Sequence, residues 1–199
     1  AVQTLRMIDV AGVRVGAPLV GYMFLSPLKH FLMKEGHRPS FIPFLRGRTG
    51  SGKSVMASLV LNLFGRDFSY DTAHPASFDD TANAISLKLF VLKDMPLLID
   101  DYHPEENPLR RRQMEDVAQR VSRMIGDGAR RSRMRNDATG QEDKPARGLC
   151  IQTGEDLPRV TESGVARMYV IDLGKGDVPL GGRELSELQK AARDGEFSQ

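Results

Sequence analysis

The chain has 199 residues, of which 40% are hydrophobic and 27% charged, so it can bury the sizeable core of a single globular domain. Its formal net charge is only +2, which excludes a function carried by total charge; any attraction to nucleic acid must come from where the arginines lie. The single cysteine, Cys150, excludes an internal disulfide, and its apolar neighbours suit a small core residue in a reducing cytoplasm.

The longest apolar segment runs from Val15 to Leu28 and is interrupted by Pro18 and Pro27. It is too short for a comfortable membrane span, so we expect no transmembrane helix and no membrane partner. Apolar side chains instead recur at helical spacing and predict one buried face of a helix that ends near Gly36. The residues of that face are Leu19, Met23, Leu25, Leu28, Phe31 and Leu32.

Residues 47–54 read Gly-Arg-Thr-Gly-Ser-Gly-Lys-Ser and fit G-x-x-x-x-G-K-[ST] at every fixed position. In such a loop, backbone N–H groups close around a phosphate, Lys53 adds a charge for the outer phosphates, and Ser54 offers a hydroxyl to Mg²⁺. The apolar run 41–45 predicts a strand before the loop and 55–63 a helix after it, the setting that aims N–H groups at an anion. The residues expected to bind nucleotide are Gly47, Arg48, Thr49, Gly50, Ser51, Gly52, Lys53, Ser54 and Val55.

The segment after this helix predicts a short second strand at residues 67–71 and then another helix. Ser77 is the expected N-cap, and Asp79 and Asp80 suit the positive helix end. The apolar face of this helix would consist of Ala82, Ile85, Leu89 and Leu92.

Residues 95–101 form a second informative stretch, an apolar run that ends in two carboxylates, as a Walker B strand does. A buried parallel strand delivers its last residues to the edge of the sheet where a nucleotide binds. We expect Asp100 to hold Mg²⁺, and Asp101 to occupy the position of a residue that polarises the attacking water.

Residues 108–126 show the spacing of an amphipathic helix. Three arginines, residues 110–112, lie near its beginning. Because these arginines oppose the helix dipole, helix stability does not explain them; phosphate contact and simple solvation remain equal alternatives.

Residues 128–144 are polar and basic and predict an extended loop or hairpin. Four arginines within it, Arg130, Arg131, Arg133 and Arg135, are the candidate nucleic-acid contacts. Alternation along a strand would point three of them to one side, as following a phosphate backbone requires; solvated loop charge is the alternative.

Two more short apolar strands are expected at residues 148–153 and 166–173, followed by a polar helix at 184–193. Thr153 ends its strand as Asp100 ends its own, either as a sensor beside the γ-phosphate or as a plain strand-end hydroxyl. We therefore divide the chain into an N-terminal helical appendage (1–39), a core (40–175), and a C-terminal helix and tail (176–199) that we expect to be cut short.

In this order the motifs resemble those of an AAA+ type P-loop ATPase and, more narrowly, the domain of unknown function 927 family. That family is phage and mobile-element helicase-like and related to superfamily 3 helicases and poxvirus-type primase-helicases. The likeness spans residues 40–173 and rests on residues 47–54, 78–84, 97–101, 126–134, 153–155 and Arg167.

The resemblance implies an α/β three-layer sandwich around a mostly parallel five-stranded sheet in the order 5-1-4-3-2, with ATP and Mg²⁺ as cofactors. It further implies a homo-oligomeric ring with nucleotide at subunit interfaces, Arg167 as an arginine finger acting in trans, and the basic segment as a DNA-contacting hairpin. That Arg167 merely precedes the last strand is the alternative. Two residues depart from the family pattern. Asp101 stands where a glutamate is usual, and Thr153 stands where superfamily 3 helicases commonly have asparagine.

The leading hypothesis is therefore an ATP-hydrolysing, helicase-like motor on DNA in the replication of a phage or mobile element. Lys53, Ser54, Asp100, Asp101, Thr153 and Arg167 would serve hydrolysis. The alternative is an AAA+ switch or loader that controls assembly with a protein partner without unwinding. A small-molecule kinase is a third possibility, but the double acid favours hydrolysis by water over transfer.

Overall fold

The computed structural model describes residues 2–68, 75–103, 105–127 and 145–198. Its centre is a parallel sheet of five strands in the order β2-β3-β4-β1-β5. The strands are β1 (Ile42–Arg46), β2 (Ala76–Ser77), β3 (Leu97–Tyr102), β4 (Cys150–Gly154) and β5 (Met168–Asp172). The predicted α/β fold and its strand order 5-1-4-3-2 are confirmed.

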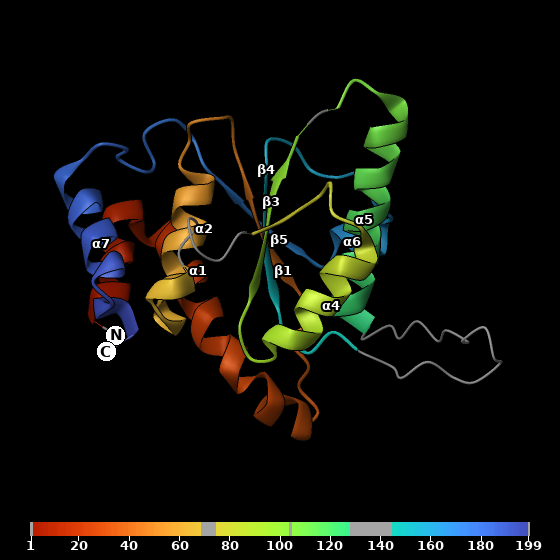
Figure 1. Ribbon diagram of the computed structural model, residues 1–199, viewed down its shortest axis with the longest axis horizontal. Coiled ribbons are helices and arrows are strands. Elements are labelled where there is room, and N and C mark those ends of the chain that lie inside the picture. The colour runs from red at the N-terminus through yellow and green to blue at the C-terminus, as the bar shows by residue number, and fades with distance from the viewer. Residues whose placement is uncertain (1, 69–74, 104, 128–144, 199) are drawn as a thin grey trace.

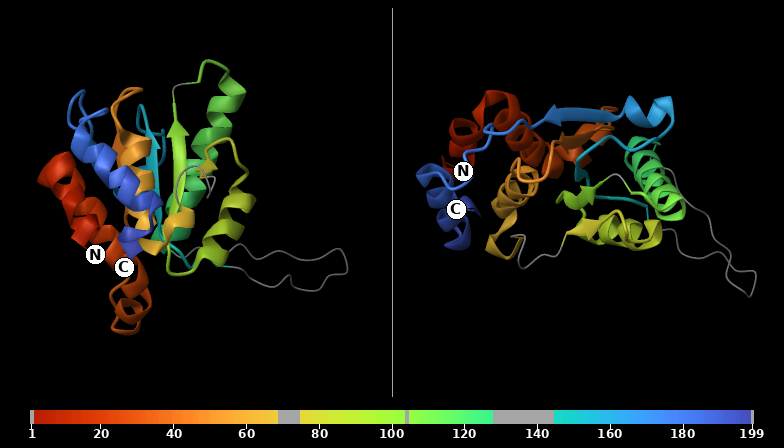
Figure 2. Two further views of the ribbon diagram at one scale, coloured as in Figure 1. Left: turned by 60° about the vertical axis from the view of Figure 1, so that its left-hand side comes forward. Right: turned by 90° about the horizontal axis from the view of Figure 1, so that it is seen from above.

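Helices cover both faces of the sheet and give three layers (Figures 1 and 2). One face carries α1 (Val2–Lys34), α2 (Lys53–Leu61) and α7 (Arg183–Arg193). The other carries α4 (Ala82–Leu92), α5 (Pro108–Asp127) and α6 (Glu162–Val165). Short 3-10 turns complete the described elements: η1 (Asn62–Phe64), η2 (Arg66–Phe68) and η3 (Glu196–Ser198).

The central strands are buried along almost their whole length, as expected where helices cover both faces of a parallel sheet. The helix predicted over 108–126 is confirmed as α5, which buries Met114, Val117, Val121 and Ile125 on one face. Cys150 is fully buried in β4, where burial raises the pKa of its thiol well above the ordinary range, as expected for a core residue.

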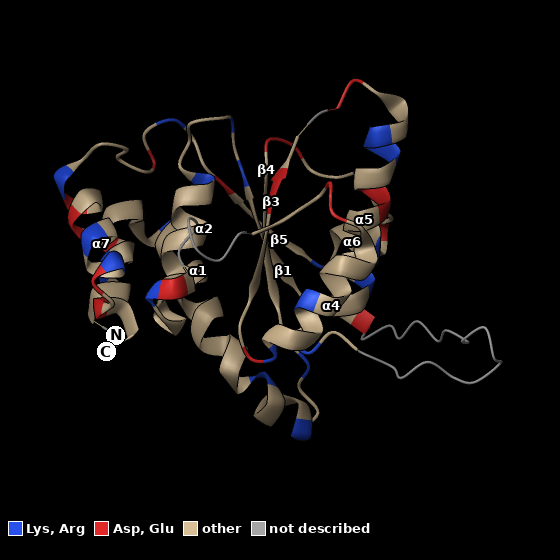
Figure 3. Cartoon of the chain, in the orientation of Figure 1, with Lys and Arg blue, Asp and Glu red and all other residues tan. Residues whose placement is uncertain are grey.

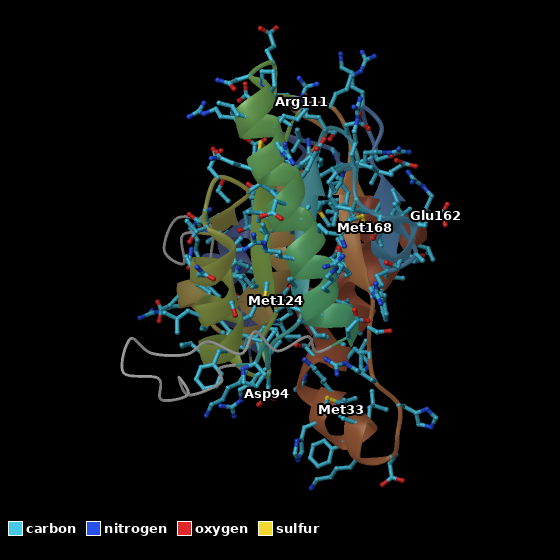
Figure 4. All side chains as sticks on the ribbon, turned by 90° about the vertical axis from the view of Figure 1, so that its right-hand side faces the viewer. Met33, Asp94, Arg111, Met124, Glu162 and Met168 are labelled. Atoms are coloured by element: carbon cyan, nitrogen blue, oxygen red, sulfur yellow. The ribbon has the colours of Figure 1, made fainter. Side chains whose placement is uncertain are left out.

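Helix α1 begins well before the predicted face and is broken at Gly12, where φ is 71°, and only part of the predicted face is buried. Leu19 and Met23 are fully buried, whereas Leu28 and Phe31 are 52% and 63% exposed, so the prediction is wrong for these two. The physical reason is that the last turns of α1 extend beyond the body of the fold, where Met33 lies in Figure 4, and no described element covers Leu28 and Phe31 there. Whether residues 1–39 form a separate unit stays a prediction.

By length and composition α1 could cross a membrane, and within the described residues no other helix could. This observation carries little weight, because core helices of soluble proteins and signal sequences meet the same criteria. Met7, Val15, Leu19 and Met23 of α1 are buried in the same core cluster as the sheet.

Two local predictions between β1 and β3 are wrong. Residues 67–68 of the strand expected at 67–71 belong to the 3-10 turn η2, and residues 69–71 lie outside the described residues. Ser77 is the last residue of β2 and not a helix cap, because α4 begins later. Its N-cap is Thr81, whose side chain accepts a hydrogen bond from the N–H of Ala84 at 3.3 Å.

Candidate functional site

The carboxyl ends of β1, β3, β4 and β5 meet at one edge of the sheet, the upper edge in Figure 1. There the loop 47–52 connects β1 to α2. A side chain at Gly47 would place its Cβ 2.4 Å from the carbonyl oxygen of Leu173, and one at Gly52 would meet Val178 at 2.8 Å. Because Gly52 also has a φ of 91°, the tight path of the loop requires glycine there.

Lys53 is held inside this loop and is only 8% exposed. Its ammonium group donates to the carbonyl oxygens of Gly47 at 2.7 Å and Arg48 at 3.1 Å. The positive charge therefore lies where the loop closes, as a phosphate-binding lysine requires.

Of the helices that begin on the side of the sheet toward which the strands end, α4 and α5 have side-chain caps, whereas α2 and α7 begin at glycines without one. Thr81 caps α4, and Asn107 accepts from the N–H of Leu109 at 2.9 Å at the start of α5. In contrast, Gly52 begins α2 with no side-chain hydrogen bond. The positive end of α2 is thus left open at the glycine-rich loop, an arrangement suited to an anion.

Asp100, near the end of β3, accepts hydrogen bonds from one residue of α2 and one residue of β4. The hydroxyl of Ser54 donates to its Oδ1 at 2.9 Å, and the hydroxyl of Thr153 donates to the same oxygen. Asp100 is 5% exposed and Thr153 fully buried. The fold therefore brings the two predicted Mg²⁺ ligands, Ser54 and Asp100, into contact from positions 46 residues apart.

Thr153 also accepts a hydrogen bond from the N–H of Asp101 at 3.1 Å, so one hydroxyl positions both acids. The backbone of Asp101 is left-handed, with a φ of 65°, at a register shift between β3 and β4. A non-glycine residue in this conformation costs about 1–3 kcal/mol and marks a constrained site. The Asp101 side chain is 71% exposed and points to solvent.

His103 is a residue of this edge that sequence reasoning missed. Its Nδ1 lies 3.0 Å from the carbonyl oxygen of Asp101 and 3.6 Å from the Asp101 carboxylate. The signal that could have found it is its place two residues after the acidic pair, on the same strand end.

Glu155 is the second missed contact, although residues 153–155 are among those that carry the family resemblance. It follows β4, and its carboxylate accepts from the N–H of Thr49 at 3.1 Å and from the Thr49 hydroxyl. The hydrogen bond with the Thr49 hydroxyl lowers the pKa of the Glu155 carboxyl, and the charges of Lys53 and His103 act in the same direction.

An open cleft of about 890 Å³ lies beside the loop, toward the end of β5. It is lined by residues 46–51, 155–156 and 172–175. Arg46 and Asp172 form an ion pair in it, with Nε and Oδ1 2.6 Å apart, which lowers the pKa of the Asp172 carboxyl. Figure 3 shows acidic residues at the end of β3 and in the loop after β4, above the same edge.

Arg167 lies at the opposite edge, immediately before β5 begins. Its guanidinium donates to the carbonyl oxygen of Ser163 at 2.8 Å and pairs with Asp127 at the end of α5. The structure therefore does not bring Arg167 together with the loop 47–52 of this chain.

Only some of the arginines that are candidates for contact with nucleic acid lie within the described residues. Arg130, Arg131, Arg133 and Arg135 lie outside the described residues. Of the arginines that begin α5, Arg110 lies 3.8 Å from the Glu105 carboxylate, and Arg111 stands at the upper end of the helix in Figure 4. Phosphate contact and simple solvation thus remain equal alternatives for residues 110–112.

Within the described residues, no group of three or more His, Cys, Asp or Glu could hold a metal ion. Magnesium commonly takes only one or two carboxylates and fills its other positions with water and substrate phosphates. The hydroxyl of Ser54 and the carboxylate of Asp100 fit that kind of site.

Comparisons with known proteins give structural neighbours only. No family model matches the sequence, and no curated protein matches it. Among solved structures, the chain resembles one described as the active helicase Cch of SCCmec type IV, with a TM-score of 0.59 and 15% identity over 96% of this chain. It also resembles the JCV helicase, with a TM-score of 0.54 and 11% identity over 98% of this chain.

These alignments cover 34% of the Cch chain and 52% of the JCV helicase chain, so this chain spans about a third to a half of them. At such identities the likeness establishes a helicase-like fold. The narrower resemblance to the domain of unknown function 927 family stays a prediction.

Proposed function

We propose that this chain is an ATP-binding and ATP-hydrolysing, helicase-like motor domain that acts on DNA in the replication of a phage or mobile element. The observation that carries the proposal is the 2.9 Å hydrogen bond between Ser54 and Asp100, at the uncapped start of α2. A glycine-rich loop, a lysine inside it, and a hydroxyl–carboxylate pair are together the parts that phosphoryl transfer from a nucleotide needs.

In this proposal the loop N–H groups and Lys53 hold the phosphates, and Ser54 and Asp100 hold Mg²⁺. Magnesium, when bound, neutralises charge that develops on the phosphate oxygens. Thr153 keeps Asp100 and the backbone of Asp101 in place, and Asp101 orients the attacking water from its strained position.

The first test compares ATP turnover by the full chain with and without single-stranded DNA over a range of salt concentrations. We expect DNA to stimulate turnover, and Lys53→Ala to abolish it. Binding of ATP without DNA-stimulated hydrolysis would contradict the motor and favour an ATPase that switches a protein partner.

The basic segment supplies a second test. Replacing Arg131, Arg133 and Arg135 by alanine should weaken DNA binding and flatten its salt dependence, with nucleotide binding retained. The matched control removes three exposed cations elsewhere: Arg66, Lys190 and Arg193. An equal loss of DNA affinity in both triple variants would mean that only net charge matters.

Arg167 is proposed to act on the nucleotide of a neighbouring subunit in a homo-oligomeric ring, since it lies away from the loop of its own subunit. Mixing Arg167→Ala subunits with Lys53→Ala subunits should then restore part of the activity that each variant lacks. Asp127→Ala is the control, because it removes the partner of Arg167 but not the arginine. If Asp127→Ala reproduces the defect and mixing restores nothing, Arg167 only fastens β5 to α5.

A further inference from the structure

Two residues of the phosphate loop (residues 47–54), Thr49 and Lys53, have their donor groups engaged within the protein. The ammonium group of Lys53 donates to two loop carbonyls, and both donors of Thr49 are directed at Glu155. The carbonyls come from the loop itself and are neutral. Glu155 differs, because it brings a full negative charge from β4, about a hundred residues away in the chain.

The position of Glu155 is fixed by the backbone around it. Its N–H donates to the carbonyl oxygen of Tyr102 at 2.7 Å, and the carbonyl oxygen of Gly154 accepts from the N–H of Gly47 at 3.1 Å. A Cβ on Gly154 would lie 2.6 Å from the Tyr102 oxygen, so the chain can approach β3 this closely only with glycine. The carboxylate is thereby delivered to the third residue of the loop.

We propose that Glu155 sets the affinity and selectivity of the phosphate loop by occupying the donors of Thr49 until a polyphosphate displaces it. This inference rests on the proposed function of the loop as a nucleotide site. A carboxylate on a loop N–H occupies the place of a phosphate oxygen, because both are anionic acceptors for the same donor. A single phosphate gains too few contacts to replace it, whereas a polyphosphate that also engages Lys53 gains several.

The displacement of Glu155 leaves the bonds at the strand ends in place. Glu155 follows Thr153 by two residues, and Thr153 holds Asp100 and the N–H of Asp101. Releasing the carboxylate breaks its bonds to Thr49, while Thr153 stays bonded to the acids. Glu155 thus acts on the loop alone, and the bonds that hold Asp100 do not depend on it.

The test measures calorimetric affinities of the full chain for Mg²⁺-ATP and for Mg²⁺-pyrophosphate. Glu155→Ala should bind both about tenfold more tightly than the natural chain, and Glu155→Gln, which keeps a neutral acceptor, should lie between the two. Asp156→Ala is the matched control, since Asp156 is the exposed neighbour whose carboxylate bonds only locally, to the N–H of Leu157. It should change either affinity by less than about twofold.

Pyrophosphate has no base or ribose, so its affinity reports on the phosphate site alone. If Glu155→Ala gained affinity for ATP but not for pyrophosphate, the proposal would be overturned. Equal gains in the Glu155 and Asp156 variants would overturn it as well, because they would reduce the effect to net charge. A weaker affinity in Glu155→Ala would mean that the carboxylate helps to hold nucleotide, the opposite of its proposed role.

A ligand-free measurement keeps the proposal distinct from the proposed function. In Glu155→Ala the amide proton of Thr49 should shift upfield and exchange faster with solvent, and in Asp156→Ala it should do neither. If no variant binds ATP or pyrophosphate while the Thr49 signal behaves as expected, the nucleotide function fails and the Glu155–Thr49 bond stands. An unchanged Thr49 signal in Glu155→Ala would overturn the bond itself.

Discussion

The two edges of the sheet use polar side chains in different ways. Where the strands end, Lys53, Asp100 and Glu155 are bonded to a loop that holds the uncapped start of a helix. Where the strands begin, Arg167 pairs with Asp127, and other polar groups fasten elements together.

Lys29 shows the second kind of role most clearly. It is 6% exposed, and its ammonium group donates to the carbonyl oxygens of Arg147 at 2.8 Å and Gly148 at 3.2 Å. These bonds connect α1 to the segment that leads into β4. Both edges thus bury a lysine on a pair of carbonyls, and the one at the strand ends also lies at the uncapped start of α2.

A charged residue near a strand therefore cannot be assigned a role by its chemistry alone. Parallel strands present their carboxyl ends, and the beginnings of the connecting helices, at one edge only. Polar groups at that edge can serve a ligand, whereas polar groups at the other edge compensate backbone atoms and charges of the fold.

Replacing aspartate by asparagine at each edge should separate chemistry from structure most strongly. Asp100→Asn keeps an oxygen for the hydroxyls of Ser54 and Thr153 but loses the negative charge that Mg²⁺ requires, so turnover should fall at least about a hundredfold. Asp127→Asn, at the other edge, should keep activity within a few-fold. Steady-state ATP hydrolysis and melting temperature are the measurements; equal loss in both variants would remove the distinction between the edges.

Glycine-to-alanine changes at both ends of β4 should each cost about 2–3 kcal/mol of unfolding free energy, because the new Cβ meets backbone. At Gly154 it would lie 2.6 Å from the Tyr102 oxygen, and at Gly148 2.8 Å from the Met95 oxygen. Only Gly154→Ala should also weaken nucleotide binding, since its carbonyl accepts from the first loop residue. Urea unfolding and ATP titration below the melting temperature would measure the two effects.

Gly21→Ala in α1 is the control for these changes, because nothing lies within 4 Å of its Cβ position. It should stabilise the chain by about 0.5–1 kcal/mol, as alanine does in a helix. A loss of stability at this position as large as at Gly154 would show that the cost does not come from the close approach of β3 and β4.

The buried lysine at the strand beginnings should give the fold a pH dependence of about 2 kcal/mol between pH 7 and 9.5. Burial, and to a lesser extent the charge of Arg38, lowers the pKa of Lys29 from 10.5 to about 8 in the folded chain. The unfolded chain therefore binds more protons in this range, so the contribution of Lys29 to stability rises with pH. Chemical denaturation at several pH values should show this rise.

Lys29→Met should remove that pH-dependent part, and Lys34→Met, at an exposed position of the same helix, should retain it. If the natural chain and Lys29→Met show parallel stability curves over this range, Lys29 titrates near its ordinary pKa and burial does not desolvate its ammonium group.

Much of the fold could be predicted because its signals are local. The loop motif at 47–54 predicts the strand before it and the helix after it. The abrupt end of the apolar run at Asp100 predicts β3. Helix α5 follows from spacing alone. These patterns arise from burial on the sheet or along one helix face, which a sequence records directly.

The errors arose where tertiary structure decides. The apolar residues Leu28 and Phe31 fit a helical face, but α1 extends past the elements that could cover them. Ser77 has the chemistry of a cap, yet pairing of β2 with β3 places it in the sheet. The bond between Glu155 and Thr49 joins residues 106 apart, and no spacing along the chain predicts such a contact.

The smallest predicted effect tests the contrast among helix beginnings near the strand ends. Thr81→Ala should cost about 1 kcal/mol, because the N–H of Ala84 loses its acceptor, and Thr81→Ser should restore most of it. Neither variant should change affinity for ATP, since α4 is capped by its own chain and α2 is not. A change in ATP affinity as large as the loss of stability would mean that the open start of α2 depends on the packing of its neighbours, and not on the loop that precedes it.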